Sequence, residues 1–494
     1  MKNHYIPQFI INRFSTAVNV FNLDTTEIRE KRPSNKIFFT KNIYTDDVEV
    51  SLNRNLETPF SSLLKSKLLK EGEIRIDRLE LGLIKKYMFV TSVRSQDLDH
   101  FCTLMCGLEK NAKLFIETVD FEGFKRSPQK KSKDMLQEMS QYDFFNQQLK
   151  ALSEFDINNA ITPYVLFNDE RLSLEMAALA CSFFFSYVAF WDSPNESEFV
   201  LSDAGIISEY EGFHQLTGGL DASKTSYLLH QMNHSAREIG SGYIRPLQTC
   251  SMMYENYDLF NIASNRCIVA INPFFRLYDS KTRHVLVDKL GRRENYQFPV
   301  PDIWPGVIRN KNLFETPYTD YTIIGHYLPS DTFVYKPKVL DSKEMIYINS
   351  LLINQSKIWI GFNDPNKVFS SFEYCLEHES EYHSVTKRNE KRADVIVNYA
   401  NNLMNSRFNK ILEWCIEQGC QTDENILAIF EELLADIYRD FNSNFYIYEY
   451  YLKNYNETYN LEQLDFLGDG DKTKKMEFLV SRYNMLKSQR GEDK

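Results

Sequence analysis

The sequence predicts an α+β, mainly helical fold, with helices around a small mixed β-sheet and a helical C-terminal module. Residues 18–23 alternate in polarity as a half-buried strand does. Long stretches, first after Thr58 and again after Pro337, repeat apolar side chains at helical spacing. At 494 residues the chain is longer than one average domain. We therefore assign residues 1–365 to a core and residues 366–494 to the helical C-terminal module.

The N-terminal segment is unusually rich in aromatic, apolar and ionisable side chains. It reads His4-Tyr5-Ile6-Pro7-Gln8-Phe9 and continues through Arg13-Phe14. Chain ends usually fray, but one of this composition is expected to dock on the body of the protein. Because an imidazole takes up or releases a proton near neutral pH, His4 is the first pointer to a site.

Short strands and then helices are expected after this segment. Asp24-Thr25-Thr26 can turn, and the apolar run Ile37-Phe38-Phe39 adds to a small antiparallel sheet. Thr58 and Pro59 predict an N-cap and the first position of a helix. One longer helix is predicted from Asp77 to about Glu109, with Arg94 on its apolar face.

The middle of the chain combines two expected insertions with a buried helix. Residues 120–150 are polar and basic, and we interpret them as an exposed excursion, with polyanion binding as the alternative. A second insertion is expected at 207–262. Residues 176–191 carry no charge but number only sixteen, against about 20 for a bilayer span, so they predict a buried core helix.

Further elements are expected along the rest of the chain. Two short strands are predicted at Glu198–Leu201 and Arg266–Ile271. The helices predicted after Pro337 cover 343–357, 391–418 and 424–441.

Composition narrows the classes of function. The net charge of −11 disfavours nonspecific binding of nucleic acid, because phosphate neutralisation needs a basic surface. The eight cysteines follow no disulfide or zinc-knuckle spacing, and no cationic leader opens the chain. We expect a cytoplasmic protein with reduced cysteines and no membrane partner.

Several short motifs occur together in one order along the chain. They are His4-Tyr5-Ile6-Pro7-Gln8-Phe9 with Arg13-Phe14, Lys41-Asn42-Ile43-Tyr44, Glu57, Arg94, Phe199-Val200-Leu201-Ser202-Asp203, Ile268-Val269-Ala270-Ile271-Asn272-Pro273 and the segment from Asn349 to Ser356. In these motifs, from residue 2 to about 360, the chain resembles the bacterial family catalogued as domain of unknown function 4238. The resemblance implies a soluble bacterial protein encoded among mobile or anti-phage genes, and it implies no established activity.

One motif departs from the family pattern. Where the family usually has Ser-Asp-Asn-Pro, this sequence has Ser202-Asp203-Ala204-Gly205. The serine and aspartate are kept, whereas the asparagine amide and the rigid proline are lost. Any role of the third and fourth turn positions is therefore in doubt.

Ionisable residues from four of these segments form the main candidate site. We assign catalytic roles to His4, Glu57, Arg94 and Asp203, and binding roles to Gln8, Arg13, Ser202 and Asn349. A histidine can act as general base or metal ligand, a carboxylate can orient it or bind a cation, and an arginine can stabilise a phosphate. Each residue also has a structural alternative: Asp203 can cap a turn, Arg94 can be a paired core charge, and His4 can bind a buried carbonyl.

A weaker metal candidate lies between the two predicted strands. His230, His234 and Glu238 have the i, i+4, i+8 spacing of ligands on one helix face. The glutamate that follows the first histidine in zincin proteases is absent, so a surface helix is the preferred interpretation. Cys102 and Cys106, one helical turn apart, are interpreted as core packing, and the acidic run with His378 and His383 as a solvated face.

Two functions from different classes follow. The first is a metal-assisted hydrolase, a nuclease or phosphodiesterase-like effector of anti-phage defence, with a divalent metal as its cofactor and a nucleic acid or nucleotide as substrate. The alternative is a noncatalytic binding or sensor protein, with a protein, a small ligand or a second copy of the chain as partner. It would use the N-terminal segment and the tyrosine-rich residues 446–459.

Overall fold

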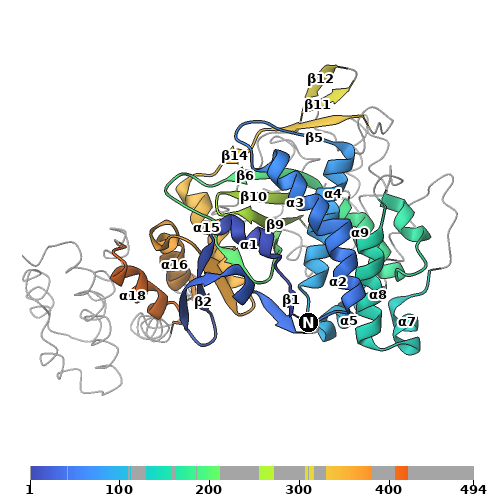
Figure 1. Ribbon diagram of the computed structural model, residues 1–494, viewed down its shortest axis with the longest axis horizontal. Coiled ribbons are helices and arrows are strands. Elements are labelled where there is room, and N and C mark those ends of the chain that lie inside the picture. Colours follow the sequence, from blue (N-terminus) through green and yellow to red (C-terminus); the bar gives the residue numbers. More distant parts are fainter. Residues whose placement is uncertain are drawn as a thin grey trace, which may run out of the picture.

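The computed structural model shows an α+β chain in which helices pack beside several small sheets (Figure 1). It describes residues 2–41, 43–109, 112, 129–156, 163–184, 186–211, 255–271, 306–309, 311–315, 330–379 and 406–420. The helices are α1 (Gln8–Phe14), α2 (Asp46–Leu52), α3 (Thr58–Leu63), α4 (Arg78–Arg94), α5 (Leu98–Gly107), α7 (Ser132–Glu138), α8 (Gln141–Glu154), α9 (Leu174–Phe184), α15 (Ser342–Asn354), α16 (Pro365–Glu379) and α18 (Asn409–Glu417). The strands are β1 (Lys2–His4), β2 (Ala17–Asn22), β3 (Ile28–Pro33), β4 (Phe39–Lys41), β5 (Ile74–Asp77), β6 (Tyr187–Asp192), β7 (Leu201–Ser202), β8 (Ile207–Glu211), β9 (Glu255–Ala263), β10 (Arg266–Ile271), β11 (Gly306–Arg309), β12 (Asn312–Glu315), β13 (Thr332–Tyr335), β14 (Lys338–Val339) and β15 (Trp359–Phe362).

The strands of the described residues form several sheets rather than the one that the sequence predicts. Their orders are β14-β6-β10-β9-β8, β12-β11-β13-β5, β3-β2-β15-β7 and the pair β1-β4. The first sheet is mixed, because β14 runs parallel to β6, whereas the pairs β6–β10, β10–β9 and β9–β8 are antiparallel. In the view of Figure 1, helices α2, α3, α4, α5, α7, α8 and α9 lie to the right of strands β9 and β10, and α15, α16 and α18 lie to their left.

The expected N-terminal strand and turn are confirmed. In β2 the side chain of Asn22 accepts the backbone N–H groups of Asp24 and Thr25 at 2.9 and 2.8 Å, which closes the turn into β3. Strand β4 starts at Phe39 and pairs with β1, so that His4 lies opposite Phe39. This pairing fixes the N-terminal segment on the body of the protein.

The predicted helix start at Thr58 is wrong. Thr58 has helical dihedrals (φ −62°, ψ −50°), and the helical path from α2 continues through a π-helical turn at Asn53–Glu57 into α3. Proline cannot donate a backbone hydrogen bond, and the wider π turn just before Pro59 lets the helix continue past it. Glu57 therefore lies within a long helical segment and does not open one.

The single helix predicted from Asp77 to Glu109 is two helices. Asp77 accepts the N–H of Glu80 at 2.8 Å, and the Glu80 carboxylate accepts the N–H of Asp77 at 2.9 Å, a capping box that starts α4. Helix α4 ends at Arg94, and extended backbone at Asp97 (φ −72°, ψ 144°) precedes α5. The break places Arg94 in a last helical turn, where other segments can reach its side chain.

The prediction of an exposed excursion at 120–150 is wrong for residues 132–150. Residues 132–154 form α7 and α8, and α8 buries Phe144, Phe145 and Leu149 against the neighbouring helices α4 and α5. Polar side chains separate the apolar ones of α8. The sequence pattern therefore showed mainly the charged and polar residues, and the buried face of the helix was missed. Residues 120–128 lie outside the described part of the chain.

The uncharged run 176–191 is half helix and half strand. Helix α9 ends at Phe184, and Tyr187–Asp192 forms β6, which pairs with β10. Aromatic and β-branched side chains favour a pleated surface, and pairing with β10 supplies one. Strand β10 is confirmed at Arg266–Ile271, whereas the strand predicted at Glu198–Leu201 is reduced to Leu201–Ser202.

The helix predicted at 343–357 is confirmed as α15, and the helices after it pack on the core. Phe372 of α16 meets Phe21 and Phe362 at ring-centroid distances of 6.5 and 5.6 Å. Trp414 of α18 donates to Glu30 at 2.9 Å. The domain boundary at 366 stays a prediction, and residues 380–405 and 421–494 lie outside the described part. No helix among the described residues is long and apolar enough to cross a membrane.

Candidate functional site

Four segments distant from α4 meet at its C-terminal end. They are the N-terminal segment, the π-helical turn that ends at Glu57, the turn after β7 and the segment that leads into β15. We call this meeting place the α4 junction and define it by His4, Tyr5, Glu57, Arg94, Asp203 and Lys357. Four of these six are the residues to which the sequence assigned catalytic roles.

Arg94 is the centre of the α4 junction. Its guanidinium forms an ion pair with Glu57 (Nη1 to Oε1, 2.6 Å) and donates to the carbonyls of Tyr5 (3.1 Å) and His4 (3.3 Å). The residue is 1% exposed. A rigid fork of five N–H donors suits this task, because one side chain can hold a carboxylate and two backbone acceptors together. Arg94 thus fastens the N-terminal segment and Glu57 to α4.

The charge of Arg94 is balanced inside the protein. Burial alone would lower the pKa of Arg94, but the neighbouring Glu57 carboxylate outweighs it and raises this pKa. The side chain of Glu57 keeps 20% of its surface exposed. Only Oε1 of this carboxylate is hydrogen-bonded within the described residues. The second oxygen can therefore accept a bond from a ligand or water.

Two buried tyrosines, Tyr44 and Tyr87, and the partly exposed Tyr5 surround Arg94. Tyr44 donates to the carbonyl of His4 at 3.4 Å, and Tyr87 stacks on Phe60 with ring centroids 3.8 Å apart. Burial raises the pKa of the phenols of Tyr5, Tyr44 and Tyr87, and the charge of Asp203 raises that of Tyr5 further. All three stay protonated at neutral pH and so supply neutral hydroxyl groups.

The Asp203 carboxylate is occupied by backbone. It accepts the N–H groups of Lys357 at 2.7 Å and of Ile358 and Trp359 at 2.9 Å each, which ties the turn after β7 to the start of β15. Burial raises the pKa of Asp203, and these three N–H bonds oppose the rise. Asp203 therefore has a structural role, but it caps the distant backbone of residues 357–359 and not the turn that follows it.

Gly205 explains the departure from the family motif. It has φ +78°, a conformation that a proline at this position could not adopt. A Cβ atom here would lie 3.2 Å from Ile6 and 3.3 Å from Thr91. The turn thus packs closely on both the N-terminal segment and α4. Lys357 completes the arrangement by donating its side chain to the carbonyl of Ser95 at the end of α4.

His4 and Gln8 form the surface of the α4 junction. Their Nε2 atoms lie 2.9 Å apart, one turn along the N-terminal segment, and the imidazole contacts Phe39 with ring centroids 5.6 Å apart. His4 is partly exposed and Gln8 is exposed. Of the residues that the sequence assigned to this place, these two and Glu57 keep exposed surface, and so does Lys357.

The other predicted binding residues lie elsewhere. Arg13 is partly exposed in the last turn of α1. Ser202 and Asn349 are buried: the Ser356 hydroxyl donates to Ser202 at 2.7 Å, and Asn349 donates to the Glu198 carbonyl at 2.9 Å and accepts the N–H of Val200 at 3.1 Å. Ser202 and Asn349 therefore hold the β7 segment in place.

The metal candidates are not brought together in the described part of the chain. His230, His234, Glu238 and His383 lie outside it. Among the described residues, no group of three or more His, Cys, Asp and Glu side chains could hold a metal ion. On α5, Cys102 is buried as predicted, whereas Cys106 is exposed, so the core-packing interpretation is wrong for Cys106.

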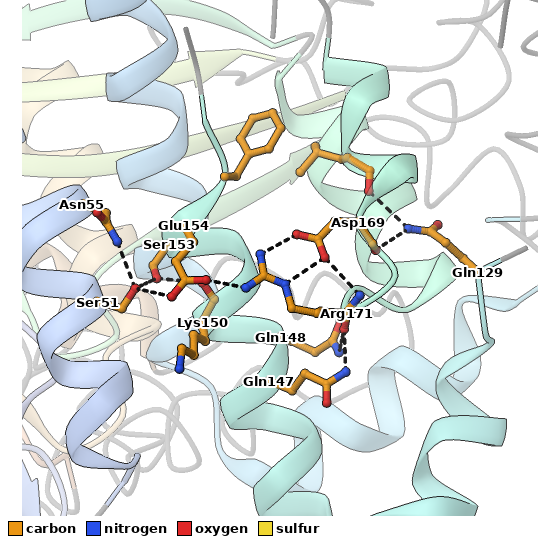
Figure 2. A network of polar contacts seen from close by, with 12 residues as sticks. Ser51, Asn55, Gln129, Gln147, Gln148, Lys150, Ser153, Glu154, Asp169 and Arg171 are labelled. Carbon is orange, nitrogen blue, oxygen red and sulfur yellow. Dashed lines mark hydrogen bonds and ion pairs between the residues drawn. The ribbon is translucent and has the colours of Figure 1, made fainter. Parts of the chain in front are cut away.

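A second polar network joins α2, α8 and the turn before α9 (Figure 2). Ser51 and Ser153 lie 2.6 Å apart (Oγ to Oγ), and Arg171 pairs with both Glu154 and Asp169. The Arg171 carbonyl accepts the side-chain amides of Gln147 and Gln148 at 2.9 and 3.0 Å. Nearly every polar group in the view thus points to another, which is the pattern of a structural network.

Next to this network, two buried lysines of α4 cap neighbouring helices. Lys85 donates to the last residue of α9, Phe184, at 2.9 Å, and Lys86 donates to the carbonyls of Ser153 and Phe155 at the end of α8, both at 2.6 Å. Helix ends leave carbonyls without partners, and cations stabilise them. Burial lowers the pKa of Lys86 to about 8. Both lysines serve packing.

Sequence reasoning missed two members of the site, Tyr5 and Lys357, and the neighbouring Tyr44. Tyr5, Tyr44 and Lys357 were not assigned roles, although Tyr5 and Tyr44 stand within the quoted motifs. Each has a contact with a residue far away in the sequence, such as Tyr5 with Arg94, Tyr44 with His4 and Lys357 with Ser95. Position within the motifs was the signal that could have found the two tyrosines. Lys357 follows the last motif directly but carried no pattern of its own.

The comparisons with known proteins agree with the motifs. The profile of the family described as "Protein of unknown function (DUF4238)" matches residues 2–366. No curated protein and no solved structure matches the chain.

Proposed function

The chain belongs to the DUF4238 family of proteins of unknown function, and we propose that its α4 junction is a ligand-recognition site without catalysis. One observation carries this proposal. The charges of Arg94 and Asp203 are engaged with the protein's own carboxylate and backbone, while His4 and Glu57 are partly exposed and Gln8 is exposed. The buried groups hold the segments of the junction in register, and we assign recognition to the exposed surface of the other three residues.

The exposed groups define the chemistry of the ligand. An imidazole, an amide and one carboxylate oxygen offer both donors and acceptors, and Arg94 neutralises the charge of Glu57. The net charge of −11 repels a polyanion. These features favour a neutral or basic polar partner, either a protein segment or a small molecule. We propose that the chain meets this partner in the cytoplasm.

A pair of matched variants tests this proposal. Gln8 and Asn12 are both exposed on α1, one turn apart, but only Gln8 contacts His4. The thermal midpoint of the full-length protein should rise with a basic peptide or a polyamine. Gln8→Ala should remove this shift, and Asn12→Ala should keep it. A shift that survives Gln8→Ala would place the ligand elsewhere.

A metal-assisted hydrolase is the second candidate, and it has one specific observation in its favour. Arg94 binds both the carboxylate of Glu57 and the backbone carbonyl of His4, so these two residues lie at one place. In this reading His4 is base or ligand, Glu57 and Asp203 hold a divalent cation, and Arg94 stabilises phosphate. Asp203 and Arg94 would first have to release their present contacts.

Turnover separates the two candidates. DNA, RNA and nucleotides should be incubated with the full-length protein and Mg²⁺ or Mn²⁺. Cleavage that His4→Ala abolishes, with Asn12→Ala unaffected, would establish the hydrolase and overturn noncatalytic recognition. An anti-phage effect that depends on Gln8 without any cleavage would favour a sensor in defence.

A further inference from the structure

Helix α18 ends in a motif that brings two cysteines together. The N–H of Cys420 donates to the carbonyl of Cys415 at 3.1 Å, and the N–H of Gly419 donates to that of Ile416 at 2.9 Å. Gly419 has φ +94°. These two bonds and the left-handed glycine define a Schellman motif, in which the side chains of the first and last residues meet. Cys415 and Cys420 occupy those two positions.

The backbone holds the two cysteines within reach of a disulfide. The 3.1 Å bond between Cys420 N and Cys415 O, added to the intervening covalent bonds, keeps their Cα atoms within about 7 Å. A disulfide needs a Cα separation of about 4.4–6.8 Å. Both residues lie in the interior, Cys415 at 0% and Cys420 at 3% exposure.

The two thiols also differ in acidity. A hydrogen bond from the Cys415 thiol lowers the pKa of Cys420, and the same interaction raises the pKa of Cys415. Thiolates are the nucleophilic form, so Cys420 is the member that reacts first. In contrast, burial raises the pKa of both Cys102 and Cys106, the other closely spaced pair. Of these two pairs, Cys415 and Cys420 form the one that combines a short separation with a lowered thiol pKa.

We propose that Cys415 and Cys420 form a reversible oxidation site, a dithiol that a small hydroperoxide such as hydrogen peroxide converts to a disulfide. The Cys420 thiolate attacks one peroxide oxygen, the O–O bond breaks, and the departing hydroxide takes up the proton of the former thiol as water. Deprotonated Cys415 then attacks the sulfur of the resulting sulfenic acid, the S–O bond breaks, and a second water leaves. Two thiols lose two electrons and two protons, and the peroxide gains them.

The oxidant must be small because the thiols are nearly inaccessible. At 3% exposure Cys420 excludes a bulky disulfide such as oxidised glutathione, whereas peroxide enters when the end of α18 opens briefly. The site lies outside residues 2–366, so it does not depend on the function proposed for the α4 junction. Trp414, next to Cys415, packs on Phe362 of β15 with ring centroids 5.9 Å apart. Oxidation therefore fixes the end of a helix that rests on the core.

Peptide mapping of the full-length protein tests the proposal. Trypsin cleaves after Lys410 and Arg439, and the peptide between them contains Cys415 and Cys420 as its two cysteines. After peroxide treatment and blocking of remaining thiols, we expect this peptide to be two hydrogen masses lighter and unblocked. Dithiothreitol should restore both thiols. A peptide with both thiols blocked, or with oxygen added at Cys420 and Cys415 still reduced, would overturn the proposal.

Two comparisons in the same experiment exclude a general effect. The measurement uses a Cys106→Ser background, because Cys106 is exposed and would consume peroxide. Cys102, buried and with a pKa raised to about 11, should react at least about tenfold more slowly. In Cys415→Ser the sulfenic acid on Cys420 should persist and react with dimedone. Equal rates at Cys102 and Cys420 would contradict the proposed activation.

Discussion

Replacing Arg94 by methionine tests whether the α4 junction is held together as the contacts indicate. Methionine keeps most of the aliphatic stem but removes the ion pair to Glu57 and the donors to the carbonyls of His4 and Tyr5. Breaking a buried ion pair from one side costs about 3–5 kcal/mol. Glu57 is 20% exposed and can regain some hydration, so the low end of this range applies.

The Tyr5 carbonyl adds to this loss, whereas the His4 carbonyl keeps the hydrogen bond from Tyr44. A buried acceptor left without a donor costs about 1–3 kcal/mol, and because Tyr5 is partly exposed we take about 0.5 kcal/mol after hydration. We therefore expect Arg94→Met to lower the free energy of unfolding by about 3.5 kcal/mol. Hydrogen exchange of residues 4–8 should rise, because the segment loses its connection to α4.

A second substitution makes the reasoning refutable. Adding Glu57→Gln to Arg94→Met removes the unpaired charge, so the double variant should regain about 1–2 kcal/mol in guanidinium denaturation. Two results would refute the reasoning. One is a loss below about 1 kcal/mol for Arg94→Met. The other is a double variant that is less stable than Arg94→Met alone.

Three further predictions concern buried polar groups. Burial raises the pKa of Glu198 from 4.5 to about 7. Folding then takes up a proton, so this residue's contribution to stability falls as the pH rises from about 4.5 to 7, by about 3 kcal/mol. Denaturation should be measured at pH 5 and at pH 8. Between these two values the stability of Glu198→Gln relative to wild type should rise by this amount, whereas that of Glu196→Gln, at an exposed position nearby, should stay unchanged. Asp203→Asn should cost about 2–4 kcal/mol in urea denaturation, because an amide cannot accept all three N–H groups; an unchanged midpoint would contradict the capping role. Lys86→Met should cost about 2 kcal/mol by leaving two carbonyls without donors, whereas Lys150→Met, whose side chain is 40% exposed, should leave stability nearly unchanged; equal losses would refute the capping of α8.

Helical spacing identified buried faces but not helix ends. The apolar stripes after Thr58 and from Asp77 to Glu109 were correctly assigned to helices, yet the break at Ser95–Asp97 and the π turn before Pro59 were missed. Periodicity reports only which side of a segment is buried. A helix can continue past proline, or stop among residues that favour helix, when neighbouring segments supply the bonds that its ends need.

The sequence motifs predicted which residues lie together at the candidate site better than they predicted what each residue does there. Position in the family motifs pointed to His4, Glu57 and Arg94, and these lie together in the structure. The same pattern assigned Asp203 to chemistry, whereas its oxygens hold the backbone of residues 357–359. A polar side chain has the same one-letter code in either role, and only its partners distinguish them.

The sequence by itself determined the α+β class, the strands β2 and β10, the helix α15 and the docked N-terminal segment. Each of these depends on local alternation, turn residues or apolar density, which neighbouring residues carry. The tertiary structure alone decided that Tyr187–Asp192 is a strand and that Asp203 caps β15, because the partners are β10 and Lys357, tens of residues away. Hydrogen bonds between distant segments, unlike periodicity, leave no pattern along the chain.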